Sequence, residues 1–220
     1  MKVVISQSNY IPWRGFIDLI RQADVYVVYD SMQFTKNDWR NRNLICNNGK
    51  IQWLSVPCGS SISRSIDDVY PVLESWNEKH LATIRHCYSK ALFWPTFSEE
   101  IIDVFNSLRG FSLTDINMRL LSFILKIENI NTKIVKDTSI LSRDKIIQAE
   151  RSERLVWLCK ELGASAYISA PAARCYLREE VFAKESISVS FYDYPKYAPY
   201  AKRDRELSWI DTLVHKGSLF

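Results

Sequence analysis

The first thirty residues constrain the fold more than any other part of the chain. The β-branched run Val3-Val4-Ile5 predicts a buried strand over residues 2–7. A tight loop that contains Pro12 and Gly15 follows, then apolar residues at helical spacing over 16–23, then a second β-branched run over 25–29. A strand, a helix and a strand in so short a stretch form a βαβ unit, and its two strands must be parallel.

The same alternation returns toward the C-terminus, with a helical block between. Residues 31–50 are polar and dense in Asn, Lys and Arg, and further strands are expected over 51–57, 132–135, 166–169 and 187–192. Helices are expected over 75–88, around 101–108 and 120–127, over 155–162 and over 208–214, with Ser75 and Glu78 as a capping box, Gly163 as a stop and Ser208 as a cap. We therefore predict an α/β fold with a Rossmann-like, mostly parallel sheet and a helical middle section. It would form a single domain over 1–220, with a helical insertion or subdomain at about 74–130.

Composition limits the class of protein, its expected cellular location and the kinds of metal site it could hold. The 220 residues are 47% hydrophobic and 25% charged, which is typical of a globular protein. No stretch approaches the ~20 apolar residues of a membrane span, and the N-terminus lacks the apolar core of a secretory signal. The five cysteines are scattered and none forms a C-x-x-C pair, so a cytoplasmic location is expected and a thiolate zinc site is not. The three histidines show no metal-ligand spacing, so no metal is expected.

Net charge gives a weaker indication. The chain has 29 basic and 25 acidic residues, a net charge of +4. This balance favours an anionic ligand such as a nucleotide or a phosphate, but it is too small to indicate nucleic-acid binding by itself.

The loop after the first strand is the first candidate site. It carries Gln7, Asn9, Tyr10 and Trp13, and ligands of open parallel sheets bind beyond the carboxyl ends of the strands. Gly15, near the start of the helix, would let a phosphate approach the backbone amides. The alternative is a capped turn in which Tyr10 and Trp13 cover the core.

The segment after the second strand is the second candidate site. Asp30 closes that strand and is expected to face the same crevice. Basic side chains here can hold phosphate oxygens, and Trp39 can stack on a sugar or a base. The candidate residues are Asp30, Gln33, Lys36, Trp39, Arg40, Asn41 and Arg42. The alternative is a solvated surface loop, which is the usual fate of charge-rich segments.

Three further features have two interpretations each. His80 shares a helical face with Trp76, so it is either a general base in a cleft or a buried structural histidine. The small-residue turn that begins at Ser169 would either hold a phosphate or allow close helix–strand packing. The tyrosines of 193–200 form either an aromatic wall of a site or a surface strap.

Several motifs resemble the WbqC-like protein family. They are the run 6–16 (SQSNYIPWRGF), Ala23-Asp24-Val25, Asp30 with 33–36 (QFTK), Trp39 with 41–43 (NRN), 53–57 (WLSVP), Trp76 with 79–81 (KHL), 167–169 (YIS) and 207–211 (LSWID). The resemblance spans nearly the whole chain and implies a place in bacterial O-antigen or surface-polysaccharide synthesis. It also implies transfer of glycine or another acyl group to an amino sugar. Ala170 departs from the family, which has glycine there, and this puts a glycine-dependent backbone approach in doubt.

A weaker similarity links the N-terminal segment to nucleotidyltransferase-type α/β proteins. Those proteins carry a pair of histidines around the loop glycine, where this chain has Trp13 and Phe16. The shared shape supports a Rossmann-like sheet, whereas the missing imidazoles disfavour adenylyl transfer.

These observations lead to a functional hypothesis of N-acyl or aminoacyl transfer to a nucleotide-linked amino sugar. His80 would be the base and Asp30 would orient it or the amine. Gln7, Asn9 and Asn41 would donate hydrogen bonds, Lys36, Arg40 and Arg42 would hold the pyrophosphate, and Trp13 and Trp39 would stack.

We expect no tightly bound cofactor, and the donor would be an acyl thioester, an acyl carrier or an aminoacyl-tRNA acting as co-substrate. One alternative is a nucleotidyl- or glycosyltransferase of the same pathway. The other is a non-catalytic module that binds a nucleotide sugar or RNA.

Overall fold

The computed structural model describes residues 1–197 and 207–220. The chain divides into two compact units. Unit 1 comprises Met1–Ser8, Gly15–Met32 and Ile130–Pro195, and unit 2 comprises Asn9–Arg14, Gln33–Asn129 and Lys196–Phe220. The chain therefore crosses between the units several times, and each unit is built from segments far apart in sequence.

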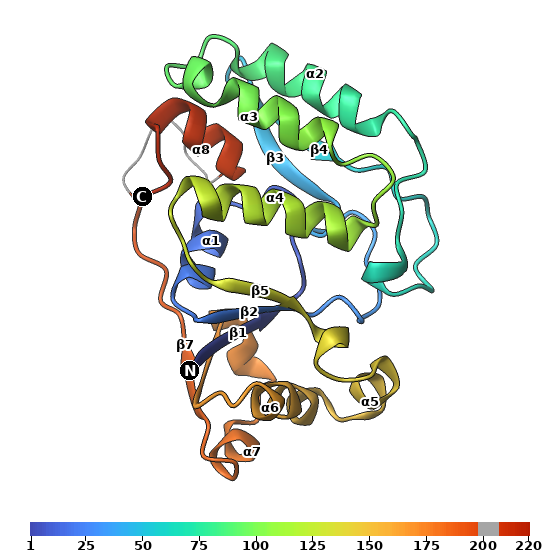
Figure 1. Cartoon of the computed structure of the whole chain (residues 1–220), viewed down its shortest axis with the longest axis vertical. Coiled ribbons are helices and arrows are strands. Elements are labelled where there is room, and N and C mark those ends of the chain that lie inside the picture. Colours follow the sequence, from blue (N-terminus) through green and yellow to red (C-terminus); the bar gives the residue numbers. More distant parts are fainter. Residues whose placement is uncertain (198–206) are drawn as a thin grey trace. The chain divides into compact units, whose positions relative to one another are not determined.

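Unit 1 contains a five-stranded parallel sheet. Its strands are β1 (Lys2–Ser6), β2 (Val25–Val28), β5 (Lys133–Lys136), β6 (Ala166–Ser169) and β7 (Ser188–Phe191), in the order β5-β2-β1-β6-β7 (Figure 1). All four neighbouring pairs are parallel, with Val3 aligned to Val25 on one side of β1 and to Tyr167 on the other. The predicted Rossmann-like α/β fold and the parallel strands of the N-terminal βαβ unit are confirmed.

Alternate residues of the central strands face two different helical layers. Val3, Ile5, Val25 and Val27 belong to a core formed with α5 (Arg143–Gln148), α6 (Arg151–Glu161) and α7 (Glu179–Ala183). On the other face, Phe16 of α1 (Arg14–Arg21) packs edge-on against Tyr26, with ring centroids 6.0 Å apart. Both faces are thus covered, which explains why the strands are continuous apolar runs.

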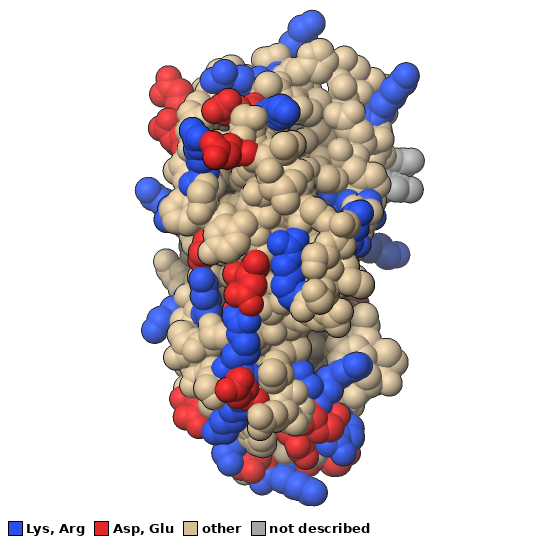
Figure 2. Space-filling model, turned by 90° about the vertical axis from the view of Figure 1, so that its right-hand side faces the viewer, with Lys and Arg blue, Asp and Glu red and all other residues tan. Residues whose placement is uncertain are grey.

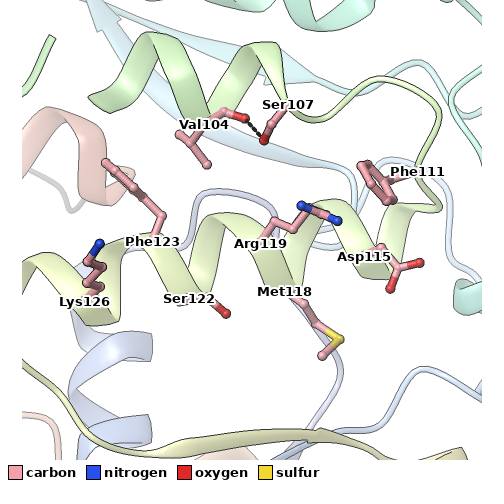
Figure 3. Close-up of a pocket in the computed structure, with 9 residues that line it drawn as sticks. All are labelled: Val104, Ser107, Phe111, Asp115, Met118, Arg119, Ser122, Phe123 and Lys126. Carbon is pink, nitrogen blue, oxygen red and sulfur yellow. Dashed lines mark hydrogen bonds between the residues drawn. The ribbon is translucent and has the colours of Figure 1, made fainter. Parts of the chain in front are cut away.

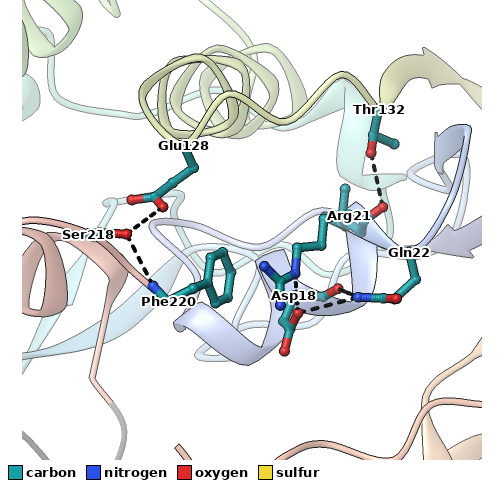
Figure 4. Close-up of polar contacts among 8 residues, drawn as sticks. Asp18, Arg21, Gln22, Glu128, Thr132, Ser218 and Phe220 are labelled. Carbon is teal, nitrogen blue, oxygen red and sulfur yellow. Dashed lines mark hydrogen bonds and ion pairs between the residues drawn. The ribbon is translucent and has the colours of Figure 1, made fainter. Parts of the chain in front are cut away.

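Polar contacts in unit 1 fix the C-terminal end of α1 (Figure 4). Arg21 Nε donates to Asp18 Oδ1 at 2.5 Å, and Gln22 also donates to Asp18. The Thr132 hydroxyl lies within hydrogen-bond distance of the Ile20 and Ala23 carbonyls, which ties the approach to β5 to the turn before β2.

Unit 2 combines a hairpin with the helical middle section. The antiparallel strands are β3 (Arg42–Asn47) and β4 (Lys50–Ser55), and the helices are α2 (Trp76–Tyr88), α3 (Trp94–Asn106), α4 (Leu113–Ile127) and α8 (Trp209–Lys216). The last residues are anchored within the unit, since Glu128 accepts a hydrogen bond from the Ser218 hydroxyl (Figure 4) and another from the Leu219 amide.

Two local expectations differ from the structure. Arg42 and Asn43 were expected at the end of a loop over 30–43 but begin β3, because Leu44, Ile45 and Cys46 are buried and pair with β4. The capping box is also wrong, since Ser75 precedes α2 without making a side-chain cap. Ser208 occupies the predicted cap position of α8 but likewise makes no cap hydrogen bond.

No helix among residues 1–197 and 207–220 has the length and apolar character needed to cross a membrane.

Candidate functional site

The carboxyl edge of the sheet in unit 1 holds the first group of candidate residues. From β1 the chain proceeds to β2 and β5 on one side, while β6 and β7 lie on the other, so the connections reverse between β1 and β6. Open parallel sheets bind ligands at such a switch point. Gln7 directly follows β1, and Ser169 ends the neighbouring β6. The structure therefore brings these two residues to the same edge.

Two serine–aspartate contacts continue along this edge. The Ser8 amide and hydroxyl donate to the Asp30 carboxylate at 2.8 and 2.6 Å. The Ser31 amide and hydroxyl donate to Asp137 Oδ2 at 3.2 and 2.5 Å. Each contact joins the segment after one strand to the aspartate after its neighbour. Both aspartates are 1% exposed, so the pairs are held away from water.

Asp137 has a strongly perturbed carboxyl group. Burial raises its pKa to about 6, hydrogen bonds from Ser31 and Thr138 oppose that rise, and the nearby Asp30 charge adds to it. A group with a pKa near the working pH is suited to proton transfer. Sequence reasoning missed Asp137, although it stands just after a strand as Asp30 does.

The two sequence-predicted residues at the switch point have local partners. Ser169 is buried and its hydroxyl lies 3.2 Å from the Tyr167 hydroxyl. The Gln7 carbonyl accepts a hydrogen bond from the Tyr26 hydroxyl at 3.3 Å, and its side chain is half-buried. These contacts hold the Gln7 backbone on one side of the switch point and the Ser169 side chain on the other.

His80 belongs to unit 2, is buried, and makes polar contacts through both ring nitrogens. Its Nε2 lies 3.0 Å from the Ser55 carbonyl, and its Nδ1 lies 2.7 Å from the Tyr10 hydroxyl. A carbonyl can only accept, so Nε2 carries the proton and Nδ1 accepts from Tyr10. The edge of the Trp76 ring closes the site at a centroid distance of 5.2 Å.

This environment determines the protonation of His80. Burial lowers its pKa to about 4, against the opposing effect of the Ser55 hydrogen bond. The imidazole is therefore neutral near pH 7, but its lone pair is already occupied by Tyr10, which is itself fully buried. The geometry favours the structural interpretation of His80 over that of a general base.

Buried amides fix the backbone around this histidine. Asn43 Nδ2 donates to the Tyr10 carbonyl at 3.1 Å, and the Tyr10 amide donates to the Trp39 carbonyl at 2.8 Å. Asn41 Nδ2 donates to the Val56 carbonyl at 3.0 Å. Within unit 2, the first loop, the hairpin and α2 are thus joined by hydrogen bonds.

The basic and aromatic candidates of unit 2 are more exposed. Trp39 and Trp53 are 45% and 44% exposed and their ring centroids are 5.4 Å apart. The Arg42 guanidinium lies 4.0 Å from the centroid of Trp53. Trp53, which sequence reasoning left out of the site, therefore forms with Trp39 and Arg42 a surface suited to stacking on a sugar or base.

Other predicted residues of unit 2 have separate surroundings. Arg40 pairs with Asp38 at 3.2 Å, and Gln33 Nε2 donates to the Ile62 carbonyl at 3.0 Å. Lys36 is exposed, whereas the Asn9 side-chain oxygen is buried without a hydrogen-bond partner. Trp13 packs edge-on against Tyr197 at a centroid distance of 6.1 Å. Tyr200, part of the proposed aromatic wall, lies outside the described residues.

The candidate residues thus fall into two groups. Gln7, Asp30 and Ser169 lie in unit 1, and Asn9, Tyr10, Trp13, Gln33, Lys36, Trp39, Arg40, Asn41, Arg42 and His80 lie in unit 2. In the described part of the chain, no three His, Cys, Asp or Glu side chains are grouped to hold a metal ion.

Surface charge is mixed on the face shown in Figure 2, where Lys and Arg side chains are interspersed with Asp and Glu side chains. This distribution agrees with the small net charge of +4. That face offers no broad basic surface of the kind that binds the nucleic-acid backbone.

Comparison with known proteins gives one family. The model of the WbqC-like protein family matches residues 7–219. Uncharacterized protein Rv1507c of Mycobacterium tuberculosis (strain ATCC 25618 / H37Rv) is 35% identical over 223 residues, which cover 99% of this chain and 94% of that protein. No solved structure matches the chain.

Proposed function

Because the chain belongs to the WbqC-like protein family, we propose that it transfers an acyl or aminoacyl group, such as glycyl, to the amino group of a nucleotide-linked sugar. The setting would be O-antigen or surface-polysaccharide synthesis in the cytoplasm. The donor would be a co-substrate rather than a bound cofactor. The observation that carries the proposal is the row of buried Ser–Asp contacts along the carboxyl edge of the sheet.

Amide formation requires removal of a proton from the acceptor amine. In the reaction a carbon–nitrogen bond forms, the bond from the acyl carbon to the donor sulfur or oxygen breaks, and the leaving group takes up a proton. Asp137, with its pKa of about 6, would accept the amine proton, and the Ser31 hydroxyl at 2.5 Å would relay it. Such proton transfer contributes roughly 10²–10⁴-fold in rate.

The other residues of unit 1 would position the sugar nucleotide. Asp30 holds the loop after β1 through Ser8, and Gln7 and Ser169 flank the switch point. Gln7 would supply an amide donor to the developing oxyanion. These roles are supported by shared placement, because the residues lie at or just after the ends of four neighbouring strands, β5, β2, β1 and β6, at one edge of the sheet.

Within unit 2 the proposal assigns two kinds of role. His80 is a positioning residue that joins Tyr10 to the hairpin, since both ring nitrogens are engaged. Trp39 and Arg42, together with Trp53, form a surface of unit 2 that would by itself stack on a sugar or base, and Lys36 and Arg40 would contribute positive charge within that unit. Asn9, Asn41, Trp13 and Gln33 would shape the surrounding loop.

The decisive experiment combines the purified protein with nucleotide-linked amino sugars and with acyl thioesters or glycyl-tRNA. We expect a product whose mass increases by the acyl group while the nucleotide is retained. Loss of the nucleotide would instead indicate the nucleotidyl- or glycosyltransferase alternative. Binding of the sugar nucleotide without any turnover would indicate the non-catalytic alternative.

A matched pair of variants tests the proposed proton acceptor. Asp137→Asn keeps the shape of the side chain and should lower kcat by about 100-fold or more. Asp144→Asn, on the exposed surface of α5, makes the same change of charge and should leave kcat unaltered. Equal rates for wild type and Asp137→Asn would remove Asp137 from the mechanism.

A further inference from the structure

A second candidate site lies wholly within unit 2, where α3 and α4 border an open groove of about 600 Å³. This volume is in the range of sites that bind small molecules. The groove is lined by side chains of both helices and of the connection between them (Figure 3). None of the residues discussed for acyl transfer lines it.

A row of three polar residues runs along one side of this groove. Arg119, Ser122 and Lys126 are spaced by three and four residues on α4, so they are neighbours on one helical face. The two cations are separated by about 10 Å along the helix axis. In the part of the chain that the structure describes, neither cation makes an ion pair. The row therefore presents two positive charges and a hydroxyl group to whatever occupies the groove.

Stacking fixes the orientation of Arg119. Its guanidinium carbon lies 3.7 Å from the centroid of the Phe111 ring, so the ring supports the flat face of the guanidinium (Figure 3). A guanidinium held by its face can still donate from its edge, which is the geometry of bidentate phosphate binding.

Aromatic surface lies beside the charged row. Phe123 lines the groove and is itself held by Trp209, with ring centroids 5.7 Å apart. Among the described residues that line the groove, the only carboxylate is that of Asp115, and it accepts a hydrogen bond from the Ser112 hydroxyl at 2.8 Å at the start of α4. Positive charge thus dominates beyond the first turn of the helix.

From these contacts we infer that the groove binds the nucleoside diphosphate part of a small ligand. The diphosphate would lie along Arg119, Ser122 and Lys126, and the base would lie against Phe123. This assignment rests on the proposed function. The groove would bind the nucleotide part of an acyl thioester donor, and the sugar nucleotide would bind at the sheet edge of unit 1.

The binding test uses the full chain and does not require turnover. ADP, pyrophosphate and adenosine are titrated calorimetrically, and ADP should bind more tightly than either fragment. Arg119→Gln and Lys126→Gln should each weaken ADP binding by about tenfold, and the double variant should abolish it. The control is Arg85→Gln with Lys90→Gln, which removes two exposed charges of unit 2 outside the groove and should leave ADP affinity unchanged.

Three results would overturn this inference. They are the absence of ADP binding by the wild type at about 1 mM, equal ADP affinities of the wild type and the double groove variant, and binding of RNA but not of ADP.

A kinetic experiment separates this inference from the proposed function. With acyl transfer established, the double variant should raise KM for the thioester only, and a raised KM for the sugar nucleotide would contradict the assignment. Without acyl transfer, the ADP titration still decides whether the groove binds nucleotides.

Discussion

At the scale of single residues, burial shifts the pKa of two titratable groups in opposite directions, although it favours the neutral form of both. It keeps His80 neutral by lowering its pKa to about 4, and it favours the neutral form of Asp137 by raising its pKa to about 6. A lowered histidine pKa and a raised aspartate pKa have opposite effects on the pH dependence of stability. Variants at each position should therefore reveal the two contributions separately.

For His80, the folded state binds fewer protons than the unfolded state between about pH 4 and pH 6.5. Its contribution to the free energy of unfolding should rise by about 3 kcal/mol as pH increases across this window. His80→Gln cannot titrate, so the stability difference between wild type and this variant should grow with pH in urea unfolding. The exposed His86→Gln is the control. A pH-independent difference for His80→Gln would show that its burial is not maintained in solution.

For Asp137 the sign is reversed. The folded state binds more protons than the unfolded state between about pH 4 and pH 6, so stability should fall by about 3 kcal/mol as pH rises through this window. Asp137→Asn removes this loss. The free energy of unfolding of this variant should therefore increase relative to that of the wild type as pH rises toward neutrality. Asp144→Asn should follow the wild-type profile, and identical profiles for all three proteins would contradict the raised pKa.

At the scale of elements, buried amides hold the hairpin of unit 2 to the first loop. Asn43 uses both ends of its amide, because Nδ2 donates to the Tyr10 carbonyl and Oδ1 accepts from the Leu44 amide. Asn43→Ala should destabilise the protein by about 2 kcal/mol, since both backbone groups lose a partner away from water. Asn106→Ala, on the exposed end of α3, should cost far less in the same unfolding experiment. Equal losses would show that these bonds do not hold the hairpin.

Helix ends provide a second comparison. Gly163 and Gly217 both have positive φ, 67° and 87°, after α6 and α8. A Cβ at Gly163 would meet open space, whereas one at Gly217 would lie 2.9 Å from a carbon of the Phe93 ring. Gly163→Ala should therefore cost about 1 kcal/mol, and Gly217→Ala about 2 kcal/mol or more. A smaller loss at Gly217 would mean that the Phe93 ring moves aside easily.

At the scale of the whole molecule, the distribution of surface charge bears on nucleic-acid binding. The net charge is +4 and the face in Figure 2 mixes both signs, so a long nucleic acid would find few adjacent cations on that face. The affinity for a 20-nucleotide RNA should fall by no more than about tenfold between 50 and 200 mM salt. A loss of about 1,000-fold would indicate many phosphate contacts and favour the RNA-binding alternative.

The division into two units also explains which site residues could be anticipated. Within unit 1 the segments after the first two strands meet, as Ser8 bonds to Asp30, whereas the single pocket expected between them stays a prediction. The basic and aromatic residues of 36–42 belong to unit 2 instead. Interleaved segments leave no boundary signal in composition, and the single domain over 1–220 with a helical insertion at about 74–130 stays a prediction.

The sequence by itself determined the local elements and the parallel sheet. Runs of β-branched residues and helical spacing depend on neighbours a few positions apart, and these are written directly in the chain. Tertiary structure alone decided the chemistry of the polar residues. His80 meets groups 70 and 25 positions away, and Asp137 meets a serine 106 positions away. Such partners are set by packing, and their burial is what shifts the pKa of each group.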